Sequence, residues 1–322
     1  MSSPGRPAPD AVRTVAVVGT GVIGGGWAAH FLRMGYDVVA WDPGGEAPQR
    51  LSALVERAWP SLERLGLSAG ASRERLRFAD TLGDALAGAD FVQESAPEVL
   101  SAKVALLATI DAQTRPDVVV ASSTSGFGMT EMAAYCQTPG RFVVGHPFNP
   151  PYLIPLVEVV GGAKTDADAV EWATEFYSGA GKVCLTMDAE VPGFVGNRLQ
   201  EALWREALHM VDSGQASVQQ IDDAITYGPG LRWALMGPML TFHLAGGPGG
   251  MAHMLDHFGP ALLEPWTRLA APPLTPQLRD RVVAGVVQAA AGRSVAELEQ
   301  RRDAFLVDLL LLLDKHRVGV DG

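Results

Sequence analysis

The stretch Val15-Ala-Val-Val-Gly19-Thr-Gly21-Val-Ile-Gly24 decides the fold of the first part of the chain. An apolar strand leads directly into three glycines with G-x-G-x-x-G spacing, and a helical pattern follows them. Gly19 permits the tight turn, Gly21 lets the backbone approach a pyrophosphate, and Gly24 lets the helix pack close to the sheet. A phosphate here lies at the helix N-terminus, where free backbone N–H groups point at it. The motif therefore predicts a dinucleotide-binding site.

An acidic residue, Asp42, directly follows the next predicted strand, Asp37–Trp41. It lies about 20 residues beyond the glycines, where a carboxylate accepts hydrogen bonds from the adenosine ribose hydroxyls of a dinucleotide. A carboxylate would repel a 2′-phosphate, and the three residues after it supply no cation. These features predict NAD rather than NADP, with FAD and a glycine turn without nucleotide as the alternatives. The first predicted cofactor contacts are Gly19, Gly21, Val22, Ile23, Gly24 and Asp42.

Short Val-rich runs alternate with helical patterns from Arg13 to about Met187. The predicted strands are Thr14–Val18, Asp37–Trp41, Phe91–Glu94, Val118–Ser122, Phe142–Gly145, Leu156–Val160 and Val183–Thr186. The predicted helices are Ile23–Met34, Ala47–Leu65, Leu100–Ala112 and Asp166–Gly179. This alternation is typical of a parallel sheet with helices on both faces. We therefore expect an α/β, Rossmann-like, doubly wound domain over residues 13–188, preceded by a floppy tail over residues 1–12.

The strand signal stops after Pro192, and the rest of the chain has helical patterns. The predicted helices are Leu199–Val211, Val218–Tyr227, Met239–Leu244, Pro276–Ala291 and Val295–Arg317. Two of them open with capping boxes, in which Ser217 and Ser294 each stand three residues before Gln220 or Glu297. The final helix carries a wide apolar stripe, which packs either within its own domain or across a dimer. Residues 189–322 are thus expected to form an all-α domain.

The composition excludes several classes of protein. Of the 322 residues, 36 are Asp or Glu and 25 are Lys or Arg, and the formal net charge of -11 disfavours nucleic acid and anionic membranes as partners. Cys136 and Cys184 are the two cysteines, too few for a disulfide framework or a cysteine metal cluster, and no metal is expected. The sequence shows neither a secretory leader nor a membrane-spanning run. A cytoplasmic protein is the expectation.

Histidine is the natural base for removing a hydroxyl proton while hydride leaves the same carbon. His146 follows the apolar strand Phe142–Gly145 and should lie at the carboxyl edge of the sheet, where ligands of such folds bind. Glu158 stands inside the apolar run Leu156–Val160, and a buried carboxylate needs a partner that an imidazolium would supply. The alternatives are a structural histidine and a glutamate that protects an edge strand. The pair is a candidate catalytic couple.

Seven stretches through both halves of the chain together resemble the L-3-hydroxyacyl-CoA dehydrogenase family. Within it the chain is most similar to the branch that acts on free short 3-hydroxy acids, the L-carnitine dehydrogenase and lambda-crystallin (L-gulonate 3-dehydrogenase) group. The matching stretches are Gly19–Gly24, Gln93–Glu98, Ser122–Ser125, His146–Pro151, Leu156–Val160, Pro192–Arg198 and Gly230–Ala234. The resemblance implies an NAD-dependent oxidoreductase with a Rossmann domain and a helical domain that forms a homodimer.

The resemblance also implies roles for single residues. His146 would be the general acid/base, Glu158 its orienting partner, and Ser125 a hydrogen-bond donor to the substrate oxygen at C3. Asn197 would hold the substrate and its developing charge, unless it merely caps a helix. Further implied cofactor contacts are Ala96, Glu98, Lys103 and Ser123. For Ser125 and Lys103 the alternatives are the end of a strand and a solvated helix residue.

The departures from the family pattern bear on the substrate. The acyl-CoA branch carries a Lys-rich helix after the second strand, whereas the stretch Ala47–Leu65 has no lysine, which disfavours a CoA thioester. Arg232 lies in a Gly/Pro-bounded loop and could bind a carboxylate bidentately, or form an ion pair between helices or subunits. Trp233, Phe148 and Tyr152 are candidates for cation–π contact with a trimethylammonium, although an aromatic at helical spacing is more often core.

These observations predict an NAD-dependent dehydrogenase that interconverts a small free L-3-hydroxy acid and its 3-oxo acid, with L-carnitine and 3-dehydrocarnitine as the first expectation. One alternative is a reductase of another 3-oxo acid, such as a polyketide or sugar-acid intermediate or an acyl-CoA. The alternative from another class is a crystallin-like protein that binds NADH without turnover. The sequence leaves open the physiological direction and the exact acid.

Overall fold

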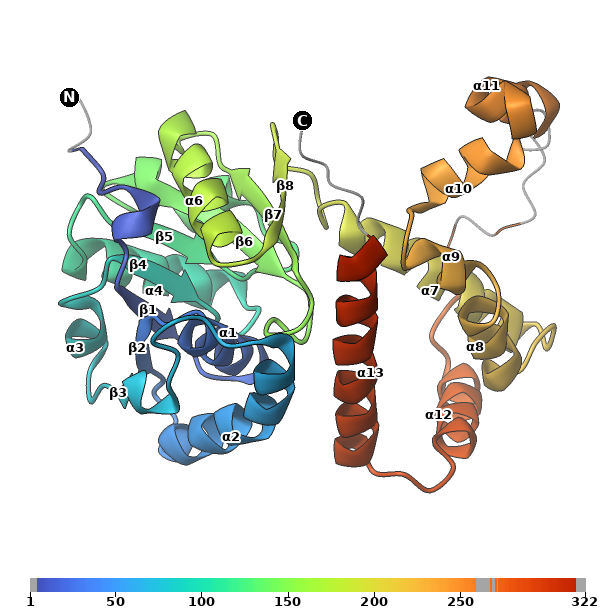
Figure 1. Cartoon of the computed structure of the whole chain (residues 1–322), viewed down its shortest axis with the longest axis horizontal. Helices are drawn as coiled ribbons and strands as arrows, with labels where there is room; N and C mark the ends of the chain where they lie inside the picture. The colour runs from blue at the N-terminus through green and yellow to red at the C-terminus, as the bar shows by residue number, and fades with distance from the viewer. Residues whose placement is uncertain (1–4, 259–266, 268–269, 271, 317–322) are drawn as a thin grey trace. The chain divides into compact units, whose positions relative to one another are not determined.

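The computed structural model describes residues 5–258, 267, 270 and 272–316 (Figure 1). The chain divides into two compact units. The first comprises Met1–Asn197 with Leu306–Asp308, and the second comprises Arg198–Phe305 with Leu309–Gly322. The first unit therefore ends later than the expected boundary at residue 188, because residues 189–197 contribute to its candidate site.

Among the described residues, eight strands of the first unit form one sheet in the order β3-β2-β1-β4-β5-β6-β7-β8. The strands are β1 (Thr14–Val18), β2 (Asp37–Trp41), β3 (Leu76–Phe78), β4 (Phe91–Glu94), β5 (Val119–Ser122), β6 (Phe142–Pro147), β7 (Leu156–Gly161) and β8 (Val183–Met187). β3 has three residues at the edge of the sheet, too few for a recognisable alternation, and it was not predicted. The other strands lie where the sequence pattern places them.

The sheet is parallel from β3 to β6, as expected, and its last two strands run in the opposite direction. β7 runs antiparallel to β6, and β8 runs parallel to β7. The physical reason is the connection between β6 and β7, residues 148–155, because a parallel return needs a crossover of about a dozen residues or more. The antiparallel register pairs His146 directly with Glu158.

The helices of the first unit cover both faces of the sheet, as expected. α1 (Val22–Arg33), α2 (Ala47–Leu65) and α6 (Ala167–Gly179) pack on one face around a core that includes Trp27, Leu51 and Phe176. The opposite face is covered by α3 (Leu82–Leu86), α4 (Leu100–Gln113) and α5 (Met129–Met132). α3 and α5 were not predicted, because neither is long enough to show a helical period.

The expected floppy tail is not what the structure shows for residues 5–12. A 3-10 turn spans Pro9–Ala11, and the buried Val12 joins the core. The carbonyl of Pro7 accepts a hydrogen bond from the Trp172 indole N–H (2.6 Å). Arg6 forms ion pairs with Asp166, just before α6, and with Asp168 on α6. These contacts fasten the segment to the first unit.

The second unit is helical over its described residues, in line with the prediction. Its helices are α7 (Gly196–Asp212), which begins in the first unit, and α8 (Val218–Thr226), α9 (Pro229–Trp233), α10 (Pro238–Ala245), α11 (Gly250–Phe258), α12 (Pro276–Ala290) and α13 (Val295–His316). Both predicted capping boxes form, at Ser217 and Ser294. The predicted loop around Arg232 is wrong, because Pro229 opens the short helix α9 there. None of the described helices is long and apolar enough to cross a membrane.

Candidate active site

A buried histidine–carboxylate pair occupies the β6–β7 register. His146 Nδ1 lies 2.8 Å from Glu158 Oε2, and neither side chain is more than 5% exposed. Because Nδ1 is engaged by the carboxylate, the imidazole keeps Nε2 as the nitrogen that can exchange a proton, and no described residue bonds to it. An imidazole oriented in this way by a buried carboxylate has the geometry of a general acid/base.

The second carboxylate oxygen of Glu158 is held by the start of α7. The backbone N–H groups of Val195 and Gly196 donate to Oε1 at 2.8 and 2.9 Å. Burial alone would raise the pKa of Glu158, but the hydrogen bonds from His146 and these two N–H groups hold it below its ordinary value. The carboxylate is therefore ionised and able to stabilise a positive charge on the imidazole.

A strained turn aims those two N–H groups at Glu158. Phe194 has φ 54°, in the left-handed region that a bulky residue rarely adopts, and Gly193 precedes it with φ 72°. The Phe194 ring is buried 5.4 Å from the His146 ring, and Phe148 packs edge-on to the same imidazole at 5.1 Å. The two phenyl rings thus fix the orientation of the imidazole, and the packing offsets the backbone strain.

The structure brings Ser125 and Asn197 together. The Asn197 amide nitrogen donates to the Ser125 carbonyl at 2.9 Å, so the side chain does not merely cap α7. The backbone N–H of Ser125 donates to Glu98 Oε1 at 2.8 Å. The Ser125 hydroxyl is exposed and has no hydrogen bond within the described part of the chain. It is available to a substrate oxygen.

Lys103 is buried beneath the segment that follows β4. Its ammonium is buried and contacts Glu94 Oε1 (2.9 Å), the Ala96 carbonyl (3.1 Å) and Glu98 Oε2 (3.5 Å). The alternative of a solvated helix residue is therefore wrong: the ammonium donates to both carboxylate oxygens of Glu94 and to the Ala96 carbonyl, and it forms an ion pair with Glu98. Lys103 fixes the segment after β4 rather than reaching out of it.

Glu94 is the residue that sequence reasoning missed. It is fully buried at the end of β4, where it binds the Lys103 ammonium, the Ala96 backbone N–H (2.6 Å) and the Ser122 hydroxyl. A carboxylate closing the apolar strand Phe91–Glu94 was the signal in the sequence, as for Glu158. Glu94 links the ends of β4 and β5, and β4 lies next to β1, which leads into the glycine turn.

The glycine turn has the shape that a dinucleotide requires. Gly19 has φ +87°, and a Cβ there would lie 2.7 Å from the Ser95 carbonyl oxygen. A Cβ on Gly21 would meet open space, so the backbone at the start of α1 is accessible to a phosphate. Val22 and Ile23 form the first turn of α1, with Val22 exposed. The cradle therefore fits a pyrophosphate.

Asp42 closes the turn on its other side. Its Oδ2 accepts the Thr20 backbone N–H at 2.8 Å, and its Oδ1 accepts that of Gly44 at 2.9 Å. Each oxygen keeps a lone pair for a ribose hydroxyl. The buried hydroxyl of Ser123, another predicted cofactor contact, accepts hydrogen bonds from the Trp27 indole N–H (3.2 Å) and the Gln93 amide (2.9 Å).

The predicted substrate residues fall in both units. Phe148 is half-buried beside His146, whereas Tyr152 packs against the core of the first unit, which is the alternative reading for an aromatic. Arg232 and Trp233 lie on α9 in the second unit, and Arg232 is exposed without a side-chain partner among the described residues. No group of three or more potential metal ligands occurs in the described ranges.

Comparison with known proteins gives consistent matches over both units. The NAD-binding and C-terminal domain models of 3-hydroxyacyl-CoA dehydrogenase match residues 14–191 and 193–297. The L-carnitine dehydrogenase of Nocardiopsis dassonvillei is 63% identical to this chain over 100% of both chains. That of Streptomyces coelicolor is 66% identical over 94% of this chain and 95% of the relative. The solved structure of 5-formyl-3-hydroxy-2-methylpyridine-4-carboxylic acid 5-dehydrogenase, an NAD+-dependent dismutase, has a TM-score of 0.81 at 30% identity, covering 94% of this chain and 99% of that one. The chain belongs to the 3-hydroxyacyl-CoA dehydrogenase family.

Proposed function

We propose that this protein oxidises L-carnitine to 3-dehydrocarnitine with NAD. The observation that carries the reaction is the buried His146–Glu158 pair, with one imidazole nitrogen left for proton transfer. The substrate follows from the relatives named above, which match the chain over nearly its whole length. Purified protein with NAD should form NADH with L-carnitine and not with D-carnitine, L-gulonate, L-3-hydroxybutyrate or its CoA ester. NADH formation only with another acid of this panel would overturn the substrate assignment.

The reaction removes a proton from the C3 hydroxyl and a hydride from C3, the carbon that bears this hydroxyl. His146 Nε2 takes the proton of the C3 hydroxyl, and the Glu158 carboxylate at 2.8 Å from Nδ1 stabilises the imidazolium that forms. NAD, when bound at the glycine turn, supplies the acceptor for the hydride. The Ser125 hydroxyl donates to the C3 oxygen, and Asn197 holds the substrate beside it. Burial of the His146–Glu158 pair excludes water from the charged imidazole.

Arg232 is our candidate for the substrate carboxylate. Its exposed guanidinium on α9 has no ion pair among the described residues, and a fork of N–H donors matches a carboxylate. We expect Arg232→Met to raise the KM for L-carnitine about 10- to 100-fold, the loss of one charged hydrogen-bond pair, and to leave NADH binding unchanged. Steady-state kinetics measure the KM, and the control variant is Arg279→Met, at an exposed arginine of α12. An unaltered KM would remove Arg232 from this role.

Asp42 sets the choice of cofactor in this proposal. We expect Asp42→Ala to raise the KM for NAD about tenfold or more, since a charged acceptor of the ribose hydroxyls is lost, and to narrow the preference for NAD over NADP. The KM for L-carnitine should stay near the wild-type value. Initial rates with both cofactors measure this preference, and an unchanged ratio of NAD to NADP turnover would contradict it.

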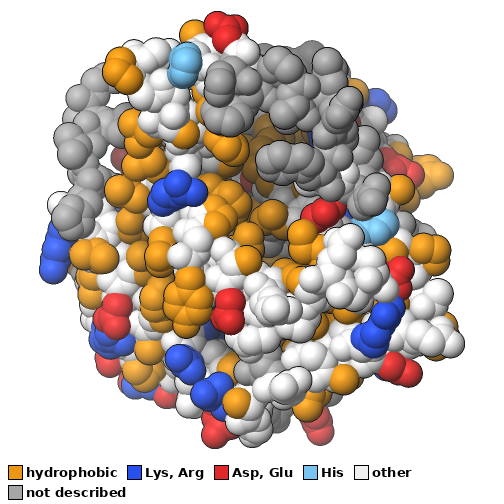
Figure 2. All heavy atoms as spheres, turned by 90° about the vertical axis from the view of Figure 1, so that its right-hand side faces the viewer, with side chains coloured by type: hydrophobic (Ala, Val, Ile, Leu, Met, Phe, Trp, Pro, Cys, Tyr) orange, Lys and Arg blue, Asp and Glu red, His pale blue; other side chains and the backbone are white. Residues whose placement is uncertain are grey.

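We infer that the chain acts as a homodimer through its second unit. Among the described residues of that unit, Pro272 and Leu278 are the buried apolar side chains. Large apolar side chains are exposed there, including Leu231, Leu235, Met239, Leu240, Leu244, Leu255, Val287 and Phe305. Figure 2 shows apolar groups scattered over the side of the molecule that faces the viewer. Apolar surface of this extent is typical of an interface.

We infer that the protein works in the cytoplasm. Cys136 and Cys184 are free cysteines, and free thiols are typical of proteins in a reducing compartment.

The dimer is testable at the exposed stripe of α13. Phe305 is 62% exposed, and a charge in its place would be desolvated at an interface. We expect the wild type to sediment as a dimer and Phe305→Asp to shift the population towards monomer. Gln300→Asp, at an exposed polar position of the same helix, is the matched control. A monomeric wild type at micromolar concentration would overturn the inference.

A further inference from the structure

The loop between His146 and Glu158 does not supply enough N–H donors for its own backbone carbonyls. Residues 148–155 join β6 to β7, and Pro150, Pro151 and Pro155 have no N–H to donate. Inside the loop, Leu153 and Ile154 both donate to the Pro150 carbonyl. The carbonyls of Pro151 and Ile154 therefore need donors from elsewhere in the fold, because buried backbone acceptors are rarely left without a partner.

Lys182, just before β8, supplies those donors. Its ammonium donates to the Pro151 carbonyl at close range and to the Ile154 carbonyl at 3.2 Å. The next backbone N–H, of Val183, donates to the Pro155 carbonyl at 2.9 Å. One short segment thus holds three carbonyls of the loop.

The same ammonium reaches the helix that follows the glycine turn. Lys182 Nζ lies 4.9 Å from the centre of the Trp27 ring on α1, a cation–π distance. The Pro151 ring rests on Gly26 of that helix, where a Cβ would lie 2.6 Å from Pro151 Cδ. The loop, α1 and Lys182 therefore pack as one assembly that connects the cofactor helix with the strand of His146.

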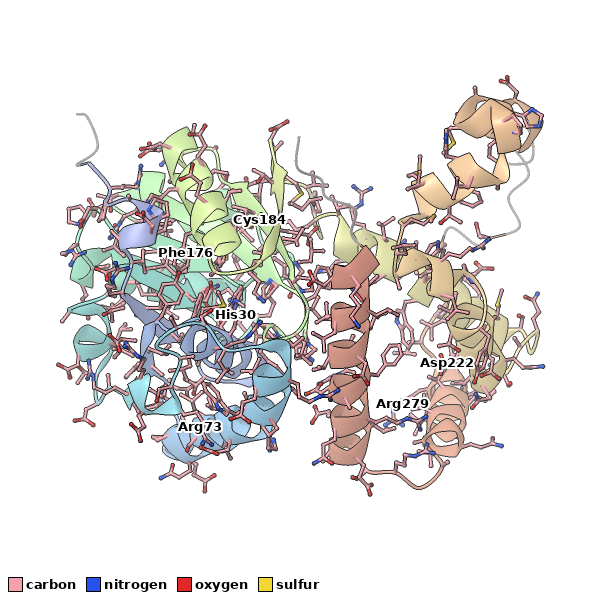
Figure 3. The ribbon with its side chains drawn as sticks, in the orientation of Figure 1. His30, Arg73, Phe176, Cys184, Asp222 and Arg279 are labelled. Carbon is pink, nitrogen blue, oxygen red and sulfur yellow. The ribbon has the colours of Figure 1, made fainter. Side chains whose placement is uncertain are left out.

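Lys182 occupies this place without a counter-ion. The side chain is 6% exposed, and no carboxylate among the described residues pairs with it. Burial, together with the positive charge of Arg33, lowers the pKa of Lys182 to about 7, and Cys184 acts in the opposite direction. His30 and Cys184, labelled in Figure 3, are its other electrostatic neighbours. Burying an amine without a counter-ion costs free energy, and the N–H groups of this amine are used by the loop carbonyls.

We propose that Lys182 is a positioning residue for the reaction: it fixes the loop of residues 148–155 against α1 and so holds His146 and Phe148 in register with the glycine turn. The inference rests on the proposed function. It concerns geometry and not binding, because Lys182 faces the carbonyls of Pro151 and Ile154 rather than a substrate. Its loss should therefore lower kcat and leave the affinity for the cofactor unchanged.

Lys182→Met, which keeps the length and removes the N–H donors, tests this role beside Lys164→Met, a control at an exposed lysine. We expect Lys182→Met to lower kcat about 10- to 100-fold, the effect of a small displacement of a catalytic group. The KM for NAD and the Kd for NADH should remain within about twofold, and Lys182→Arg, which retains donors, should recover part of kcat. An unchanged kcat, or equal losses in kcat and NADH affinity, would overturn the proposal.

Hydrogen exchange of the amides in residues 148–155 gives a readout that does not depend on turnover. In Lys182→Met, exchange should rise in this loop and stay unchanged in β1, β4 and α4. A rise throughout the first unit would assign Lys182 a general structural role and overturn the proposal, as would unchanged loop exchange. If Lys182→Met does not fold, the same comparison is made on Lys182→Leu, which also lacks the N–H donors. If wild-type protein does not oxidise L-carnitine, only the proposed function is overturned, because hydrogen exchange in the loop is measured without turnover.

Discussion

Replacing His146 with glutamine should abolish turnover while leaving NADH binding near the wild-type value. Glutamine fills a similar volume and can still hydrogen-bond to Glu158, but its amide cannot take a proton from the substrate hydroxyl. We expect kcat to fall about 100- to 10,000-fold, the usual contribution of a general acid/base. Stopped-flow or steady-state NADH absorbance gives kcat, and quenching of protein fluorescence gives the Kd for NADH.

The control for this variant is His243→Gln, at a histidine of α10 in the second unit. It should retain kcat within about twofold. Turnover retained in His146→Gln would remove His146 from the chemistry. Loss of NADH binding together with turnover would show that the substitution had disturbed the first unit as a whole.

Replacing Glu158 with glutamine should lower kcat by as much as the loss of His146. The carboxylate accepts three hydrogen bonds, one from His146 and two from the backbone N–H groups at the start of α7. A glutamine keeps its oxygen on the two N–H groups and presents its NH2 to His146, so Nδ1 becomes the acceptor and Nε2 carries the proton. That tautomer cannot act as a base, and we expect kcat to fall about 10,000-fold, as in other orienting carboxylates of this kind.

Glu158 should also contribute to the free energy of unfolding, and the size of this contribution should depend on pH. The pKa of Glu158 is lowered in the folded state, so its ionised form contributes stability that is fully present above the ordinary glutamate pKa of about 4.3. The contribution is lost as pH falls through the lower folded value. We therefore expect the difference in free energy of unfolding between wild type and Glu158→Gln to shrink on acidification below about pH 4. Urea unfolding at pH 7 and pH 3.5 measures it, and a difference that grew on acidification would contradict the assignment.

Much of the first unit could be predicted because its signals are local. The bounds of β1, β2 and β4 follow from apolar runs that end in glycine or acidic residues, and the turn at Gly19 follows from the motif. The contact between His146 and Glu158 was also foreseeable, since each is a polar residue beside or within an apolar strand and needs a partner. The catalytic roles of these side chains stay predictions that the variants above will test.

Strand direction and side-chain burial could not be predicted in the same way. An apolar run looks alike in either direction, and the reversal of β7 depends on the length of the loop before it. The burial of Lys103 and Lys182 depends on acceptors far along the chain, Glu94 for one and the loop carbonyls for the other. No local pattern in the sequence contains these partners. The segment 5–12 is ordered by α6 for the same reason.

The fate of the hydrogen on C3 tests the proposed reaction most directly. Wild-type protein is given NAD and L-carnitine that carries deuterium at C3, and the reduced cofactor is analysed by mass spectrometry. In the proposed reaction His146 removes the hydroxyl proton and hydride leaves C3. We therefore expect one deuterium in each NADH formed, none in the water, and a lower kcat/KM than with unlabelled L-carnitine. NADH without deuterium, with the label retained in the product or released to water, would contradict oxidation at C3.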